Sequence, residues 1–157
     1  MTRVLGVDLG SRRIGLAVSD PSGTIATPLQ VLERGTDHAT DHATIVKVAR
    51  DLDVERLVVG WPRSLSGRDG PAARVVQEEV VELEAAAGAS LAVELHDERF
   101  STVTATRQLR EARPTSRGRR SDKGSGGGRR TREPVDAAAA AVFLQSYLDG
   151  AHTPEAP

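Results

Sequence analysis

The chain has 157 residues, and its 21 basic and 22 acidic residues leave a formal net charge of −1. This length suits one domain, and the absence of cysteine excludes thiol catalysis, thiolate zinc sites and a secreted disulfide framework. The sequence holds no signal-like segment and no run of about 18 apolar residues. We therefore expect a cytoplasmic protein with no membrane partner, a single domain over residues 1–149 and a flexible tail over 150–157.

The first part of the chain predicts three strands in succession. The segments "RVLGVDLG" (3–10) and "IGLAVSD" (14–20) are rich in β-forming residues, and the short connection between them is typical of a hairpin. The segment "IATPLQVLE" (25–33) follows, and Pro28 places it at a sheet edge or at a bulge. Strands in this order with short connections pair antiparallel.

Helices and strands alternate in the middle of the chain. Apolar residues at helical spacing predict a helix over residues 37–52, and the short apolar run 56–61 is typical of a covered parallel strand. Pro71 suits the first turn of a helix that Gly88 would end. The segment "SLAVELHDE" (90–98) predicts the next strand.

The last part of the chain predicts two helices separated by a basic segment. Helical patterns cover residues 101–112 and 134–149, whereas residues 115–132 contain no apolar residue and are expected to form a mobile loop. Residues 113–133 hold eight basic residues against two acidic ones, while the rest of the chain has an acidic excess. Such an asymmetry indicates a polyanionic partner, although a solubilising loop would also explain it.

Together these elements predict an α/β fold with a five-stranded mixed sheet. The first three strands would be antiparallel, and the last two would join the first strand in parallel through right-handed crossovers. Helices would flank the sheet.

Acidic residues occupy the ends or middles of the predicted elements. Asp8 interrupts the first strand, Asp97 and Glu98 end the last strand, and Asp136 lies in the first turn of the last helix. An apolar stripe follows Asp136 at helical spacing, so its carboxylate should face the sheet, although a helix N-terminus alone also favours an acid. Buried charges need partners, and clustered carboxylates are ligands that Mg²⁺ and Mn²⁺ prefer.

Four blocks of the sequence resemble the YqgF/RuvX family, whose members are known as pre-16S rRNA nucleases or Holliday-junction-resolvase-like proteins. The blocks are "GVDLGSRRIGLAVSD", "LVVGWPRSLSG", "HDERFST" and "PVDAAAAAVFLQSYLD", in the family's order. The resemblance implies a ribonuclease H-like fold and metal-dependent hydrolysis of phosphodiesters. It also implies that Asp8, Glu98 and Asp136 are the catalytic residues and the ligands of Mg²⁺ or Mn²⁺.

Two features complicate a direct transfer of the family's site. The family's loop block usually reads closer to "GLPLNMDG", whereas Trp61, Ser64 and Ser66 replace its leucine, asparagine and aspartate here. Alternation along the last strand puts Asp97 on the face of the apolar residues and Glu98 on the other face. We follow the resemblance and choose Glu98, with Asp97 as the alternate ligand.

The candidate substrate contacts are basic or hydroxyl side chains near the acids or in the basic segment. Arg99 follows Glu98 and is placed to hold a phosphate oxygen, although an ion pair with one of the acids would explain it equally well. Because aromatic residues are few, we expect recognition of nucleic-acid backbone and shape. The predicted contacts are Ser11, Arg12, Arg13, Arg99, Arg119, Arg120, Arg129 and Arg130.

The histidines favour simple interpretations. His38 and His42 lie four residues apart in "TDHATDHA" with no third ligand nearby, which favours a solvated helix start over a zinc site. His96 lies beside the acids, and a proton shuttle is the alternative to the preferred interpretation, an ordinary strand-edge histidine.

The function predicted from the sequence is a metal-dependent endonuclease that processes the 5′ end of precursor 16S rRNA, with ribosomal particles as a further partner. Resolution of four-way DNA junctions is the alternative. A symmetric junction requires paired active sites and hence a dimer. Because the sequence shows no clear dimerisation surface, we favour a monomer acting on RNA and leave a dimer open. A non-catalytic rRNA-binding factor is a second alternative. A phosphoryl-transfer domain is a third alternative. Proteins of that class need two such domains to close over a nucleotide, and 157 residues are too few for both.

Overall fold

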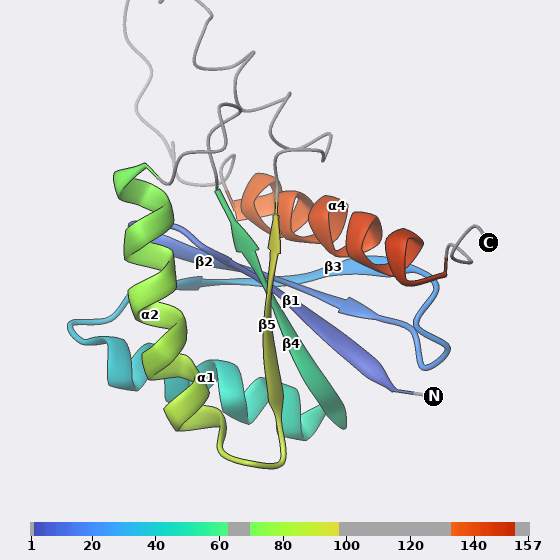
Figure 1. The fold of residues 1–157 in the computed structure, drawn as a ribbon, viewed down its shortest axis with the longest axis horizontal. Helices are drawn as coiled ribbons and strands as arrows, with labels where there is room; N and C mark the ends of the chain where they lie inside the picture. The colour runs from blue at the N-terminus through green and yellow to red at the C-terminus, as the bar shows by residue number, and fades with distance from the viewer. Residues whose placement is uncertain (1, 63–69, 98–132, 153–157) are drawn as a thin grey trace, which may run out of the picture.

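The computed structural model describes residues 2–62, 70–97 and 133–152, which form a five-stranded sheet with helices on both faces (Figure 1). The strands are β1 (Arg3–Leu9), β2 (Arg13–Ser19), β3 (Ala26–Glu33), β4 (Val54–Trp61) and β5 (Ala92–Asp97). Their order in the sheet is β3-β2-β1-β4-β5. The β1–β2 and β2–β3 pairs are antiparallel, and the β1–β4 and β4–β5 pairs are parallel. The predicted mixed sheet is confirmed.

Helices α1 and α2 begin at the residues that the sequence predicts. Helix α1 (His38–Asp51) starts after Asp37, whose carboxylate accepts a hydrogen bond from the Thr40 N–H at 2.7 Å. Helix α2 (Pro71–Ala87) has proline in its first turn and ends before Gly88, which has a φ of 73°. No helix in the described ranges combines the length and apolar character that a membrane crossing requires.

Helix α4 (Glu133–His152) extends three residues into the segment that we expected to be a flexible tail. The expected boundary lies just before Gly150. Gly150 stays helical and does not adopt the positive φ that Gly88 has, so it does not end the helix.

Two apolar layers lie on opposite faces of the sheet. Helices α1 and α2 cover one face, where they pack on side chains such as Leu5 and Val7 of β1. Helix α4 covers the other face, where Val4 of β1 packs in the same cluster as Phe143 and Leu144 (Figure 1). Because successive strand residues point to opposite faces, the even-numbered residues of β1 face α4.

The edge strand β3 carries the irregularity that its proline predicts. The pairing between β2 and β3 shifts register between Leu16 and Ala17, whose partners are Gln30 and Pro28. Proline has no N–H to donate to the sheet and is tolerated at edges and bulges. Both predicted placements of Pro28 are therefore confirmed.

Candidate active site

Asp8 lies near the end of the central strand, and its side chain is buried with 8% of its surface exposed. Its place in β1, two residues after Gly6, puts it on the face that α4 covers, because a Cβ at Gly6 would lie 3.0 Å from Leu144. Its partner in β2 is Gly15. The Asp8 carboxylate therefore lies beneath α4. The contact at Gly15 shows which part of that helix covers it.

Gly15 shows that the first turn of α4 lies directly over this part of the sheet. A Cβ at Gly15 would overlap the carbonyl oxygen of Asp136 and lie 2.7 Å from its carbonyl carbon. Opposite residues of an antiparallel pair share a face, with Cβ positions about 5 Å apart. The Asp8 side chain and the Asp136 backbone therefore lie over neighbouring positions, and the absence of a side chain at Gly15 permits this approach.

Asp136 is half-exposed and lies close to one of the predicted substrate contacts. Its Oδ2 is 3.9 Å from Nη1 of Arg13, and the two side chains are 38% and 31% exposed, respectively. An ion pair of this length and exposure contributes little to stability. Arg13 is therefore able to exchange Asp136 for another anion without a large loss of folding free energy.

The turn that follows β1 presents the other predicted contacts. The Gly10 N–H donates to the Asp8 carbonyl at 3.1 Å and to the Arg13 carbonyl at 3.0 Å, and a Cβ at Gly10 would lie 2.5 Å from that second oxygen. Ser11 and Arg12 are exposed. A hollow of about 400 Å³ is lined by Ser11, Arg12, Arg13, Glu33 and Arg34. Glycine at position 10 keeps this turn tight beside Asp8.

Strand β5 divides its polar side chains between the two faces. Glu94 accepts a hydrogen bond from the Tyr147 hydroxyl at 2.7 Å, and Nε2 of His96 lies 3.4 Å from Oγ of Ser146, so both residues face α4. Val93 packs in the opposite layer, and alternation puts Asp97 with it. Regular alternation therefore predicts that Asp97 lies on the face opposite Asp8.

His96 lies level with Asp8 on the α4 face. Val7 of β1 pairs with Val59 of β4, and Val59 pairs with Leu95 of β5, so one residue further along each strand Asp8, Gly60 and His96 lie in line. Gly60 contributes no side chain between the other two. Burial lowers the pKa of His96, and the neighbouring Asp97 opposes this shift. As expected, His96 lies on an edge strand of the sheet, where it contacts Ser146 and Tyr147 of α4.

The rest of the predicted site lies outside the described residues. This holds for the third carboxylate, Glu98, and for the remaining arginines, Arg99, Arg119, Arg120, Arg129 and Arg130. It also holds for the expected helix over 101–112 and the expected loop over 115–132. Within the described ranges, no group of three or more histidine, aspartate or glutamate side chains is arranged to hold a metal ion.

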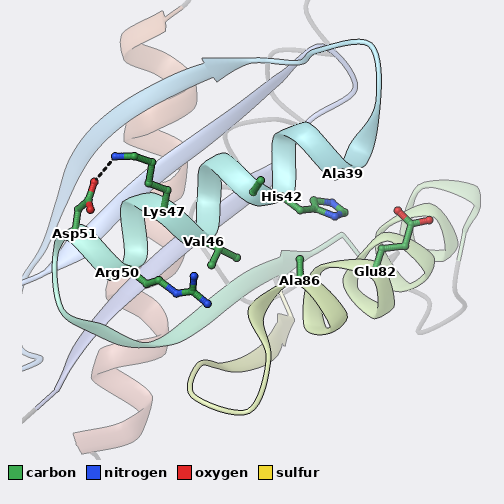
Figure 2. A pocket seen from close by; sticks show the side chains of 9 residues that line it. Ala39, His42, Val46, Lys47, Arg50, Asp51, Glu82 and Ala86 are labelled. Atoms are coloured by element: carbon green, nitrogen blue, oxygen red, sulfur yellow. Dashed lines mark hydrogen bonds and ion pairs between the residues drawn. The ribbon is translucent and has the colours of Figure 1, made fainter.

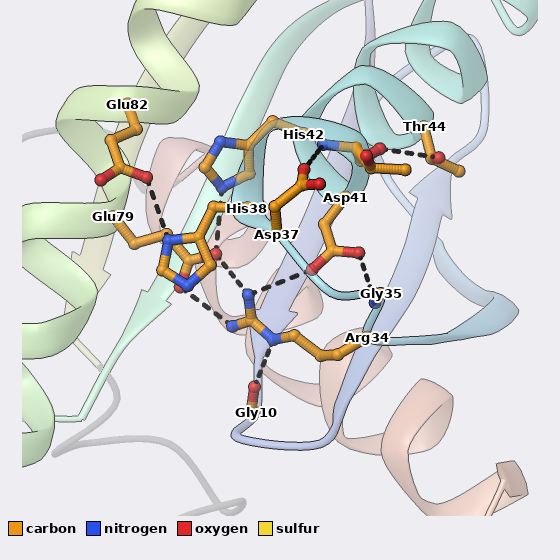
Figure 3. A network of polar contacts seen from close by, with 11 residues as sticks. Gly10, Arg34, Gly35, Asp37, His38, Asp41, His42, Thr44, Glu79 and Glu82 are labelled. Atoms are coloured by element: carbon orange, nitrogen blue, oxygen red, sulfur yellow. Dashed lines mark hydrogen bonds and ion pairs between the residues drawn. The ribbon is translucent and has the colours of Figure 1, made fainter.

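His42 corrects the expectation of a solvated helix start. Its side chain is 2% exposed, and Nε2 lies 3.0 Å from Oε1 of Glu79 in α2 (Figure 3). Burial raises the pKa of Glu79, but hydrogen bonds from Arg34 and His42 outweigh burial and hold this pKa below its usual value. Because a carboxylate only accepts, His42 donates. The periodicity of α1 could not reveal this contact, since the partner belongs to another helix.

A second hollow, of about 570 Å³, lies between α1 and α2, on the face of the sheet opposite α4 (Figure 2). An ion pair of 2.8 Å between Lys47 and Asp51 lies at its rim. The other lining residues are Ala39, His42, Ala43, Val46, Arg50, Glu82 and Ala86. This hollow is separated by the sheet from Asp8 and Asp136, so it belongs to a different surface.

Comparisons with known proteins identify the family. A family model described as "RuvX: Holliday junction resolvase" matches residues 2–150. A protein of Anaeromyxobacter dehalogenans (strain 2CP-1 / ATCC BAA-258) is 46% identical over 147 residues, which cover 94% of this chain and 96% of that protein. A Nocardioides protein is 44% identical, with 92% and 86% covered. A protein of Mycobacterium sp. (strain KMS) is 37% identical, with 94% and 79% covered. All three are named "Putative pre-16S rRNA nuclease".

A solved structure shares the fold. Thermus thermophilus RuvC in complex with a Holliday junction substrate superposes with a TM-score of 0.53 at 16% identity, and 98% of each chain is covered. At this identity the likeness shows the fold alone. The ribonuclease H-like fold that the sequence resemblance implied is confirmed.

Proposed function

This chain belongs to the RuvX family, and from that premise we propose that it is a metal-dependent nuclease that processes the 5′ end of precursor 16S rRNA. The curated relatives that match nearly the whole chain at 37–46% identity carry the name of a pre-16S rRNA nuclease. Ribosomal particles in the cytoplasm are the setting that this substrate implies, and they form part of the proposal.

The observation that carries the proposal is the approach of α4 to Gly15, which brings the first turn containing Asp136 over the strand pair that holds Asp8. Two carboxylates at one edge of a sheet form an oxygen-rich donor set, which fits Mg²⁺ or Mn²⁺. Asp8, Asp136 and Glu98 would hold the metal. Glu98 is retained rather than Asp97 because the even-numbered residues of β5 face α4, as Asp8 does.

The chemistry divides between the metal and the side chains of this chain. When bound, divalent metal supplies activation of water and neutralisation of charge on a phosphodiester. Arg13 would exchange its weak ion pair with Asp136 for a phosphate oxygen of the substrate, because a guanidinium pairs with phosphate through two parallel hydrogen bonds. Ser11 and Arg12, exposed on the same turn, would hold a neighbouring phosphate and fix the strand in register.

A four-way DNA junction is the second candidate substrate, and the description of the matching family model favours it. Both substrates are structured nucleic acids, so the same carboxylates would serve either. The names of the full-length relatives favour RNA.

The test compares wild type with Asp8→Asn, Asp136→Asn and Glu98→Gln on an RNA that spans the 5′ end of precursor 16S rRNA, and on a four-way DNA junction. Each reaction is run with Mg²⁺, with Mn²⁺ and with EDTA. We expect wild type to cleave the RNA only with metal, and each variant to lose at least about 100-fold in rate, because each removes a charged ligand.

Asp51→Asn is the matched control, since Asp51 pairs with Lys47 at the surface of α1, away from the site. It should cleave as wild type does. Asp97→Asn should also retain activity if Glu98 is the ligand. Cleavage that persists in all three ligand variants, or that is insensitive to EDTA, would contradict the proposal. RNA binding without metal-dependent cleavage would support a non-catalytic rRNA-binding factor instead.

A further inference from the structure

A buried ionic cluster connects both helices of one face to the turn beside Asp8 (Figure 3). At its centre is Arg34, which follows β3. Nη1 and Nη2 of Arg34 donate to the two carboxylate oxygens of Glu79 at 2.5 and 2.9 Å. Nη1 also lies 3.6 Å from Oδ2 of Asp41 in α1. Arg34 thus joins the segment after β3 to both α1 and α2.

The same arginine holds the turn between β1 and β2 by two further hydrogen bonds. Nε of Arg34 donates to the Gly10 carbonyl at 2.9 Å, and the Arg34 backbone N–H donates to the Arg12 carbonyl at 3.0 Å. These two carbonyls flank Ser11, and they belong to the turn that follows Asp8. Arg34 therefore anchors this turn to the ionic cluster on either side of its exposed serine.

Arginine suits this position better than lysine would. Its planar guanidinium gives two parallel hydrogen bonds to Glu79 and leaves Nε for a third direction, whereas an ammonium group is a point charge without a fixed fork. Asp41 and Glu79 are 6% and 2% exposed, and Oδ2 of Asp41 has no hydrogen-bond partner within the described residues. Two buried carboxylates require this cation, because unpaired buried charges are strongly destabilising.

The cluster itself is not the reacting centre. It lies on the α1 and α2 side of the sheet, whereas Asp8 faces α4. Among the described residues, Arg34 connects the cluster to the turn beside Asp8 through the Gly10 and Arg12 carbonyls. Arg34 lines the same hollow as Ser11, Arg12 and Arg13, together with Glu33, so the anchor and the predicted substrate contacts share one surface.

We propose that Arg34 is a positioning residue for substrate binding, which holds the Gly10–Arg13 turn so that Ser11, Arg12 and Arg13 meet a nucleic-acid phosphate in a fixed geometry. This inference rests on the proposed function, since it assumes a nucleic-acid substrate. The anchored carbonyls limit the motion of the turn, and Glu79 and Asp41 limit the motion of Arg34. Affinity gained from a preorganised loop falls when the loop is released, even though every contacting side chain is still present.

The test is a double-mutant cycle between Arg34→Lys and Arg12→Ala, because Arg34 holds the turn through backbone carbonyls that Arg12→Ala leaves in place. Binding of a fluorescently labelled RNA that spans the 5′ end of precursor 16S rRNA is measured by anisotropy in EDTA, where binding is read apart from cleavage. In the wild-type background, Arg12→Ala should weaken binding about tenfold. In the Arg34→Lys background the same change should weaken binding less than about threefold, because the guanidinium no longer holds the Gly10 carbonyl and only the backbone hydrogen bond to Arg12 remains.

Equal factors in the two backgrounds would overturn the proposal, since a purely structural role of Arg34 gives additive effects. Arg56→Lys is the matched control. Arg56 is also held by polar side chains, Tyr147 and Glu94, but these belong to α4 and β5. The effect of Arg12→Ala in the Arg56→Lys background should be that seen in wild type. If Arg34→Lys does not fold, Glu79→Gln keeps Arg34 and weakens its anchor, and it takes the same place in the cycle.

Amide hydrogen exchange separates this inference from the proposed function. The Gly10 N–H is hydrogen-bonded within the turn, so its exchange reports release of the turn with no substrate present. The Gly10 amide should exchange at least about tenfold faster in Arg34→Lys than in Val80→Ala, a core truncation in α2. Denaturant is used to bring the two variants to the same global stability before the comparison. Equal exchange would overturn the positioning role whether or not RNA binds. If the amide exchanges faster in Arg34→Lys but the wild-type protein does not bind the RNA, the proposed RNA substrate is refuted and the anchoring of the turn by Arg34 is retained.

Discussion

Gly15→Ala tests the packing that places the first turn of α4, which carries Asp136, over the strand pair that holds Asp8. Carbon atoms in contact normally lie about 3.5–4.0 Å apart, whereas the added Cβ would lie 2.7 Å from the carbonyl carbon of Asp136. The obstacle is helix backbone and cannot rotate away. The first turn of α4 must therefore move by on the order of 1 Å relative to Asp8.

The expected result is a large loss of activity with a moderate loss of stability. Overpacking of this kind costs about 1–3 kcal/mol, which corresponds to a fall in Tm of about 2–12 °C for a chain of this length. A displacement of about 1 Å between groups that act together can reduce a rate about 100-fold. Thermal unfolding and the rate of RNA cleavage with Mg²⁺, measured well below the Tm, check the two values.

Gly6→Ala is the matched control, because it lies on the same face of β1 and also adds a methyl group beneath α4. Its Cβ would lie 3.0 and 3.3 Å from two side-chain atoms of Leu144, and 3.4 Å from the carbonyl oxygen of Ala140. Leu144 lies about two helical turns beyond Asp136. A comparable loss of stability with much less loss of activity is expected. Equal losses of activity in the two variants, or full activity in Gly15→Ala, would refute the reasoning.

Two further predictions concern charge. Glu79→Gln should flatten the pH dependence of the free energy of unfolding. The pKa of Glu79 is lowered in the folded state, so wild type loses stability as the pH falls below the pKa of glutamate in the unfolded chain, about 4.3. The variant lacks this contribution. Urea unfolding between pH 3 and pH 6 (a range chosen to bracket the value of about 4.3) measures the difference, and parallel curves would contradict it. Deletion of residues 115–132 should weaken RNA binding and reduce its dependence on salt, because phosphate contacts by basic residues release counterions. Anisotropy titrations over a salt series check this, and an unchanged slope would exclude these residues from the interface.

The sequence predicts most of the described fold because local signals and periodicity agree. Asp37 caps α1, Pro71 opens α2, and Gly88 ends it. The stripe behind Asp136 predicts which face of α4 packs on the sheet, and hence the neighbourhood of Asp8. The end of α4 is the exception, because Gly150 stays helical and lacks the positive φ of Gly88, and the sequence does not specify this.

The remaining features depend on contacts between distant elements. The burial of His42 requires Glu79 from another helix, and the anchor role of Arg34 requires the turn at Gly10. Neither partner is encoded in the local pattern. Helices cover both faces of the sheet, so alternation along β5 separates Asp97 from His96 without telling which face carries the chemistry.

The most direct test of the central claim is Mn²⁺ binding, followed by electron paramagnetic resonance, in wild type, Asp8→Asn and Asp136→Asn, with Asp51→Asn as the control. If the two carboxylates hold metal together, wild type and the control bind Mn²⁺ with the same affinity, and each of the other variants loses at least about tenfold while retaining its fold. Equal Mn²⁺ affinity in all four proteins would contradict the claim.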